Sequence, residues 1–235
     1  MTADASFKDY FSDQSANYAR YRPQYPDALF DYLAGLCDAH ERAWDCATGN
    51  GQSALGLAER FDRVIGTDAS AAQIEAAIPH PKVSYRVAPA ERSGLDDASI
   101  ELLTVGQALH WFDLPRFFAE ANRVVKDTGV VAAWSYRMCT VQQGVDAVLD
   151  ELYSGIVDEF WPAERVIVDN CYRDIEFPAP LLEVPPFVMS LAMHVDDMLG
   201  YLRTWSASKR YAMQHDADPV GIIEARLRKA WGDGV

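Results

Sequence analysis

The stretch Ala43-Trp44-Asp45-Cys46-Ala47-Thr48-Gly49-Asn50-Gly51 joins a short apolar run to two glycines, and it decides the predicted fold. The run at 42–46 predicts a buried strand, and a helix is expected to begin near Gln52. Because glycine has no Cβ, Gly49 and Gly51 would let the backbone approach a bulky ligand closely. A Gly-x-Gly pair also fits a plain strand-to-helix turn that needs glycine only for its dihedral angles. The neighbouring segments must distinguish these two interpretations.

The composition limits the class of protein. With 235 residues, 49% of them apolar, the chain can bury one sizeable α/β core. A net charge of -14, from 35 acidic and 21 basic residues, would repel nucleic acid. The four cysteines are widely spaced, so neither a zinc site nor a disulfide framework is expected. The absence of a leader pattern and of a long apolar run predicts a cytoplasmic protein without a membrane partner.

Apolar and polar segments alternate along the first 136 residues as in an α/β protein. Strands are expected at 42–46, 63–67, 83–87, 100–105 and 130–136, and helices at 27–37, 53–61, 71–78 and 114–125. Right-handed crossovers then give a Rossmann-like, doubly wound, mostly parallel sheet with its ligand crevice at the carboxyl ends of the strands. Asp68 ends the second strand, where a βαβ unit offers a carboxylate to ribose hydroxyls. The alternative is that Asp68 caps the next helix.

Several segments, taken in order and spacing, resemble class I S-adenosylmethionine-dependent methyltransferases of the type 11 group. The chain is most similar to the branch that contains trans-aconitate methyltransferases. The segments are Arg22-Pro23-Gln24-Tyr25-Pro26, Asp45 to Gln52, Val64 to Ser70, Gln107 to Asp113, Arg123 to Gly129 and Thr204-Trp205-Ser206. The resemblance implies that S-adenosyl-L-methionine is the cofactor, that S-adenosylhomocysteine is the product and that a small molecule is methylated.

The resemblance also implies which residues bind the cofactor. Asp45 would hold the ammonium group, Asp68 the ribose hydroxyls, and Glu91 the adenine edge. The full set of candidate cofactor-binding residues is Tyr18, Arg22, Asp45, Ala47, Gly49, Gly51, Asp68, Ala69, Ala90, Glu91, Gln107 and His110. Ala47 departs from the family pattern, which usually has a third glycine there. No metal site is expected.

The methyl acceptor is less constrained by the sequence. Because a carboxylate nucleophile needs no base, carboxylate O-methylation is the leading prediction, with N-methylation or phenol O-methylation of a small aromatic metabolite as the alternative. His110 is the candidate catalytic base, or else a packing residue beside Trp111. Candidate acceptor-binding residues are Tyr18, Trp111, Tyr136, Arg137, Trp161 and Arg165, with Arg173 and Arg203 as further arginines. For each arginine, a surface salt bridge is the competing interpretation.

We expect a single domain in four parts. Residues 1–26 would form an N-terminal lid, 27–136 the cofactor-binding core, 137–185 a helical cap insertion, and 186–235 the C-terminal part of the core. Helices are expected at 145–160, 195–205 and 219–231, and a strand at 187–194. The last antiparallel strand that the family normally has is missing from the pattern. A monomer or homodimer is expected.

Two other functions compete with methyl transfer. The glycine loop could bind a nicotinamide dinucleotide in an oxidoreductase, although it matches Gly-x-Gly-x-x-Gly/Ala only if Ala54 is accepted. The chain could also be a non-catalytic module that binds the cofactor and acts through protein contacts.

Overall fold

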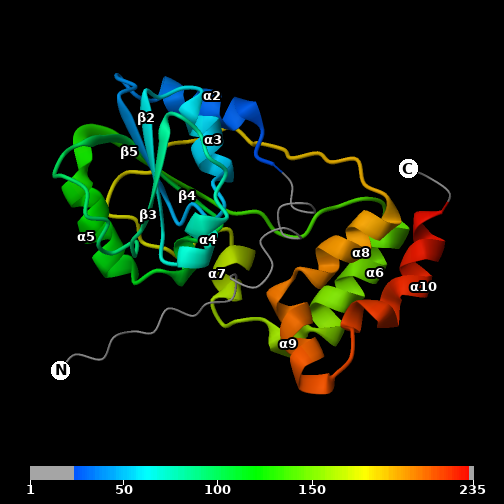
Figure 1. Cartoon of the computed structure of the whole chain (residues 1–235). Helices are drawn as coiled ribbons and strands as arrows, with labels where there is room; N and C mark the ends of the chain where they lie inside the picture. Colours follow the sequence, from blue (N-terminus) through cyan, green and yellow to red (C-terminus); the bar gives the residue numbers. More distant parts are fainter. Residues whose placement is uncertain (1–23, 233–235) are drawn as a thin grey trace, which may run out of the picture. The chain divides into compact units, whose positions relative to one another are not determined.

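The computed structural model describes residues 24–232, which form two compact units. The first contains Gln24–Tyr136 and Asn170–Met189, and the second contains Arg137–Asp169 and the residues from Ser190 onward (Figure 1). The expectation that residues 186–235 belong to the sheet core therefore differs from the structure, which assigns those from Ser190 onward to the second unit. The lid role of residues 1–26 and the cap role of residues 137–185 stay predictions.

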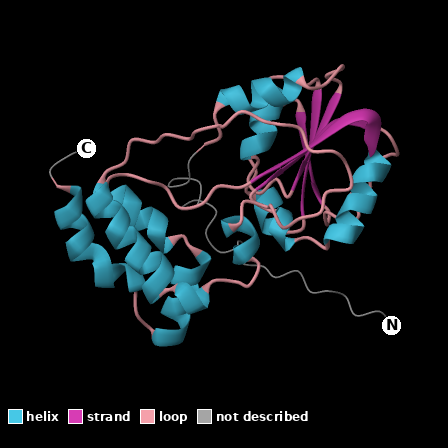
Figure 2. Cartoon of the chain, turned by 180° about the vertical axis from the view of Figure 1, so that it is seen from behind, coloured by secondary structure: helices cyan, strands magenta, loops and turns pink. Residues whose placement is uncertain are grey.

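A five-stranded sheet forms the centre of the first unit (Figure 2). Its strands are β1 (Arg42–Cys46), β2 (Arg63–Asp68), β3 (Val83–Val87), β4 (Ile100–Gly106) and β5 (Val125–Trp134). Their order is β3-β2-β1-β4-β5, and all four neighbouring pairs are parallel. The predicted Rossmann-like, doubly wound sheet is confirmed. The chain reverses its direction of progress across the sheet between β1 and β4, which is where ligands bind in such folds.

Helices cover both faces of this sheet. They are α2 (Asp27–Gly35), α3 (Gln52–Ala58), α4 (Ala71–Glu75) and α5 (Leu114–Val124), with a short 3-10 helix, η2, at Leu109–Trp111. The apolar faces of α2 and α3 pack on one side of the sheet, where Phe30 and Leu57 join Ala43, Val64 and Leu102 in one cluster. Figure 1 shows α5 on the opposite side of the strands. The central strands β1, β2 and β4 are mostly buried, whereas the edge strands β3 and β5 are only partly buried.

Several elements of the first unit differ from the prediction at their ends, and one of them is α3, which ends at Ala58 instead of residue 61. Helix α4 ends at Glu75, three residues earlier than expected. Strand β5 begins at Val125, directly after α5, because Val125 already pairs with Ile100. Ile100 pairs with Val125 and Leu102 pairs with Val130, so residues 126–129 form a register irregularity within β5.

The prediction of a strand at 187–194 is wrong. No strand follows β5 within residues 24–232. The segment begins after two consecutive prolines, Pro185 and Pro186, which lack the N–H that a strand ladder requires. Val188 and Leu191 remain 73% and 53% exposed, so their apolar character does not reflect burial in a sheet. Phe187 packs against the ring of Tyr32, and Met193 packs against the apolar core of the second unit.

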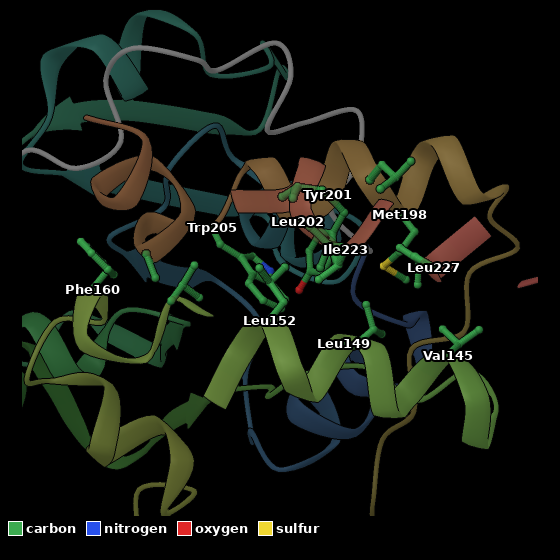
Figure 3. Close-up of a cluster of buried hydrophobic side chains, with 14 residues drawn as sticks. Val145, Leu149, Leu152, Phe160, Met198, Tyr201, Leu202, Trp205, Ile223 and Leu227 are labelled. Carbon is green, nitrogen blue, oxygen red and sulfur yellow. The ribbon is translucent and has the colours of Figure 1, made fainter. Parts of the chain in front are cut away.

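Helices alone build the second unit, and they enclose their own apolar core (Figure 3). They are α6 (Gln143–Asp150), the π-helical η3 (Glu151–Ile156), η4 (Asp158–Phe160), α7 (Arg165–Asp169), α8 (Val195–Arg203), α9 (Ser206–His215) and α10 (Pro219–Trp231). Leu149 and Leu152 point toward Leu202, Ile223 and Leu227 in this core. Because each unit has its own buried cluster, each has its own source of hydrophobic stability.

The helices predicted for this unit from the sequence are fewer and simpler than those in the structure. The single helix expected at 145–160 consists of α6, η3 and η4, and the low helix propensity of Gly155 favours the departure from α geometry in η3. Helix α9 was not predicted at all. Of its ten residues only Ala207 and Ser208 are buried, so it has no apolar stripe that a sequence pattern could reveal.

The described residues contain no membrane-spanning helix, no cluster of metal ligands and no disulfide. Within residues 24–232 no helix has both the length and the apolarity needed to cross a membrane. In the same range, no three His, Cys, Asp or Glu side chains gather as they would around a metal ion. The four cysteines are free thiols.

A buried ionic network joins α5 to the loop that follows β3. The Glu120 carboxylate accepts hydrogen bonds from the Ser93 backbone N–H (2.7 Å) and hydroxyl (2.6 Å), and from the Arg123 guanidinium (2.8 and 2.9 Å). Arg123 also donates to the Leu95 carbonyl oxygen at 2.8 Å. The hydrogen bond from Arg123 is the main reason that the pKa of Glu120 falls from 4.5 to about 2. The network fixes the loop that carries Ala90 and Glu91.

Glu120→Gln should lower the free energy of unfolding by about 1–3 kcal/mol at pH 7, because the neutral amide loses the charge-assisted bonds to Arg123. Since the folded-state pKa is depressed, the carboxylate contributes its stability above pH 4.5 and loses it as the pH falls toward about 2. Urea denaturation between pH 7 and pH 3 should therefore show the gap between the two proteins shrinking with acid. Glu75→Gln, on the exposed side of α4, is the control. A gap that stays constant over this range would contradict the proposed network.

Candidate active site

The loop between β1 and α3 lies at the carboxyl edge of the sheet, beside the point between β1 and β4 where the chain reverses. Asp45 anchors it. Its buried carboxylate accepts hydrogen bonds from the hydroxyls of Thr48 in the loop (2.5 Å) and Thr104 in β4 (2.9 Å). Burial raises the pKa of Asp45 to about 6, although both hydroxyls lower it. Asp45 thus ties the loop to two strands.

Three residues of this loop have left-handed backbone conformations: Ala47 (φ 56°), Gly49 (φ 56°) and Gly51 (φ 93°). For Ala47 this conformation costs about 1 kcal/mol, which glycine would avoid. The structure therefore gives a physical reason for the glycine that the family usually has at this position.

The two glycines of the loop serve different purposes. A Cβ on Gly51 would lie 2.2 Å from the Tyr85 hydroxyl oxygen, so packing within the protein already requires glycine there. Among the described residues, the atom nearest to a Cβ on Gly49 would be the Gln73 side-chain oxygen, at 3.8 Å, so no described side chain fills the space beside it. The plain-turn interpretation accounts for Gly51, whereas the space beside Gly49 fits the approach of a ligand.

Asp68 ends β2 next to this loop. One oxygen of its carboxylate accepts the Gly49 backbone N–H and the other accepts the Ser70 backbone N–H, both at 2.9 Å. The alternative that Asp68 caps the next helix is wrong, because the N-cap of α4 is Ser70, whose hydroxyl accepts from the Gln73 N–H. A carboxylate oxygen has two lone pairs, so accepting one backbone N–H does not by itself prevent it from accepting another donor.

The loop after β3 reaches the same edge. Glu91 accepts a hydrogen bond from the Asp113 backbone N–H at 3.0 Å, next to the start of α5. Ala90 is buried beside it, and Ala69, after β2, is half-buried. The structure thus brings Ala69, Ala90 and Glu91 to the ends of neighbouring parallel strands, as predicted.

The segment after β4 supplies the remaining predicted residues of the first unit. Gln107 has a left-handed backbone (φ 58°), and its side-chain amide donates to the Tyr136 carbonyl oxygen at 3.0 Å. His110 lies in η2 with its ring centroid 4.7 Å from that of Trp111. Its Nδ1 is 3.1 Å from the Tyr172 hydroxyl oxygen. Gln107, His110, Trp111 and Tyr136 therefore lie at the ends of β4 and β5.

Sequence reasoning missed three residues of this site. Thr48 had a local signal, since a hydroxyl three positions after Asp45 can bond back to it. Thr104 and Tyr172 had none, because only the sheet register and the fold of residues 170–189 bring them to Asp45 and His110.

The other predicted residues lie elsewhere. Tyr18 and Arg22 fall outside the described residues. Arg137, Trp161 and Arg165 belong to the second unit, where Arg137 is 58% exposed and lies 3.6 Å from Asp169. Arg203 forms surface ion pairs with two acidic residues, as the competing interpretation predicted.

Arg165 differs from these surface arginines. Its guanidinium carbon lies 5.1 Å from the ring centroid of Tyr153 and 4.7 Å from that of Trp161. Its Nε donates to the Tyr153 hydroxyl oxygen at 2.6 Å and to Asp169 at 3.2 Å. Stacking and hydrogen bonds therefore hold this half-buried cation in one orientation.

Comparisons with known proteins agree with this geometry. Residues 44–133 match the family model Methyltransf_11, described as a methyltransferase domain. A candidate methyltransferase of Dictyostelium discoideum is 34% identical over 229 residues, which cover 96% of this chain and 87% of that protein. An uncharacterized methyltransferase of Mycobacterium tuberculosis is 32% identical over 131 residues, or 54% of this chain and 52% of that protein.

A solved structure extends the likeness to three dimensions. A candidate type II methyltransferase from Anaeromyxobacter dehalogenans is 47% identical, covers 91% of both chains and superimposes with a TM-score of 0.85. The family match, the relative that spans nearly the whole chain and this structure agree with one another. The chain belongs to the class I S-adenosylmethionine-dependent methyltransferases.

Proposed function

We propose that this methyltransferase transfers the methyl group of S-adenosylmethionine to a carboxylate oxygen of a small acidic molecule and so forms a methyl ester. Family membership establishes the reaction class. The acidic acceptor is our proposal, and the observation that carries it is the oriented, half-buried guanidinium of Arg165. No feature of the described residues favours the phenol or amine alternatives in the same way.

The residues at the edge of the sheet fit the proposed cofactor. The space beside Gly49 accommodates the close approach of a ligand, as already described. Asp68 ends β2 beside Gly49, and the two oxygens of a carboxylate suit a vicinal diol. We propose that Gly49 and Asp68 contact the cofactor directly, and that Asp45, which is buried beneath the loop, acts mainly by holding it. Ala47, Gly51, Ala69, Ala90, Glu91 and Gln107 complete the proposed set, with Tyr18 and Arg22 retained from the sequence.

In this methyl transfer, the main task of the protein is to position the two reactants. S-adenosylmethionine supplies an electrophilic methyl group on a sulfonium. A carboxylate is ionised at neutral pH and attacks without a base, so this chain must align the acceptor and exclude water. Trp111 and Tyr136, half-buried at the carboxyl edge, are proposed as apolar walls for the acceptor.

Arg165 supports the choice of an acid. Its Nε is occupied by Asp169 and Tyr153, and within the described part of the chain neither Nη1 nor Nη2 has a partner. Two parallel N–H donors on a planar cation match the two oxygens of a carboxylate. Trp161, whose ring lies against the guanidinium, is proposed to share this role, with Arg137 as a weaker candidate. The resemblance to the trans-aconitate branch favours di- and tricarboxylic acids.

Gly49→Ala should weaken binding of S-adenosylhomocysteine at least tenfold, or about 1.4 kcal/mol, because the added Cβ would occupy space assigned to the ligand. Isothermal titration calorimetry measures this. Gly232→Ala is the matched control: Gly232 also has a left-handed backbone (φ 73°), no atom of the described residues lies within 4 Å of a Cβ there, and it belongs to the second unit. Equal affinities for the two variants would refute the assignment of Gly49.

The product should be a methyl ester. Incubation with methyl-tritiated S-adenosylmethionine and a panel of small carboxylic acids, trans-aconitate included, should label a compound that releases volatile methanol in mild alkali. Phenols and amines in the same panel give ethers and N-methyl products, which are stable to alkali. An alkali-stable labelled product as the main outcome would exclude carboxylate methylation.

Arg165→Gln should raise the KM for the acidic acceptor roughly tenfold or more, since a charge-assisted bidentate pair is lost, with little change in affinity for S-adenosylhomocysteine. Steady-state kinetics with the best acid of the panel tests this. Arg203→Gln removes a guanidinium of the same unit that already has surface partners, and it should leave KM unchanged. The same KM shift in both variants would point to a general charge effect.

A further inference from the structure

The indole N–H of Trp134 is a buried donor without an acceptor. Trp134 is the last residue of β5, and within residues 24–232 no group accepts a hydrogen bond from its buried Nε1. By contrast, Nε1 of Trp44, on β1, donates to the Thr67 hydroxyl oxygen at 2.8 Å. A buried donor that has given up water and found no partner in the protein costs free energy, and such groups are rare in native proteins. The N–H of Trp134 therefore requires a physical reason.

The sheet register places this indole on the face that carries the candidate site. Asp45 of β1 pairs with Thr104 of β4. On β5, Ala132 pairs with Thr104 and Trp134 pairs with Gly106. Side chains two positions apart in a strand point to the same face of the sheet, as do the side chains of paired residues. The indole therefore shares a face with the carboxylate that holds the loop between β1 and α3.

Gly106 allows the indole to lie against the end of β4. A Cβ on Gly106 would be 3.1 Å from Cζ2 and 3.2 Å from Cε2 of Trp134, which is too close for ordinary packing. Because Cε2 is bonded to Nε1, the N–H belongs to the edge of the ring that lies next to β4. The ring of Tyr25 packs on the indole edge-to-face, with centroids 5.3 Å apart and planes at 85°. Packing thus fixes the position of the unpaired donor.

The strand order separates this donor from the main cofactor residues. Gly49, Asp68 and Glu91 lie at the ends of β1, β2 and β3, whereas Trp134 ends β5. With about 4.8 Å between neighbouring strands, the end of β5 is about 10 Å from that of β1, on the side away from β2. That part of the edge is where Trp111 and Tyr136 are proposed as walls for the acceptor.

We propose that the indole N–H of Trp134 binds the methyl acceptor by donating a hydrogen bond to one of its carboxylate oxygens. This inference rests on the proposed function, in which an acidic acceptor lies at the carboxyl ends of β4 and β5. It deepens that function, because an N–H can only donate and a carboxylate oxygen is a strong acceptor. A molecule without an oxygen at this place would leave the buried N–H unpaired and bind less well. Trp134 is thus a specificity-determining residue.

The hydrogen bond can be observed without turnover. Each acid of the panel, trans-aconitate included, is added to ¹⁵N-labelled protein with saturating S-adenosylhomocysteine, and the six indole N–H signals are followed. Correlation with its own backbone amide assigns the Trp134 signal, and Trp134→Phe confirms the assignment. At least one acid should move the Trp134 proton signal downfield, as formation of an N–H···O bond does. The Trp44 signal is the internal control and should not move, since its N–H already has a partner.

Kinetics provide the second readout. Trp134→Phe should raise the KM for the acceptor roughly five- to tenfold, as expected for one hydrogen bond, with unchanged affinity for S-adenosylhomocysteine. Trp231→Phe, which removes an indole of the second unit, should change neither value. A Trp134 signal that responds to none of the acids, or that moves with S-adenosylhomocysteine and no further with an acid, would overturn the inference even if Trp134→Phe failed to fold. Failure of the proposed function would appear separately, as an alkali-stable product.

Discussion

The candidate site depends on the buried carboxylate of Asp45. It belongs to β1, receives a hydrogen bond from Thr104 on β4, and receives another from Thr48 in the loop that leads to α3. A single side chain thus joins the two strands between which the chain changes direction and the loop that crosses that point. Burial raises its pKa to about 6, so keeping it ionised at neutral pH opposes folding. The hydroxyl donors offset part of this free-energy cost. The remaining cost accompanies the hydrogen bonds by which Asp45 holds the loop.

The loop itself divides into a packing part and an open part. Gly51 is glycine because Tyr85 fills the space where a Cβ would lie, whereas Gly49 lies next to space that no side chain of residues 24–232 fills. Asp68 closes the loop from the other side by accepting the Gly49 N–H. A Gly-x-Gly motif that appears uniform in the sequence therefore contains one residue fixed by the fold and one that is open to a ligand.

The two units differ in the groups that they contain. The first has the sheet edge with its carboxylates and backbone donors, and the second has an apolar core of its own with an arginine stacked on aromatic rings. Because each unit has a separate core, residues can change around Arg165 without disturbing the register of the sheet.

The sequence by itself determined the parallel sheet and the strand-end residues, because apolar runs, glycines and acidic residues near strand ends are local signals. It also indicated the family. It failed at residues 187–194, where apolar side chains follow two prolines and stay exposed, and at α9, which has no apolar stripe. Which glycine faces open space, which arginine is oriented and which tyrosine reaches His110 were decided only by the tertiary structure. Each of these depends on atoms brought together from distant parts of the chain, and a local pattern holds no information about such contacts.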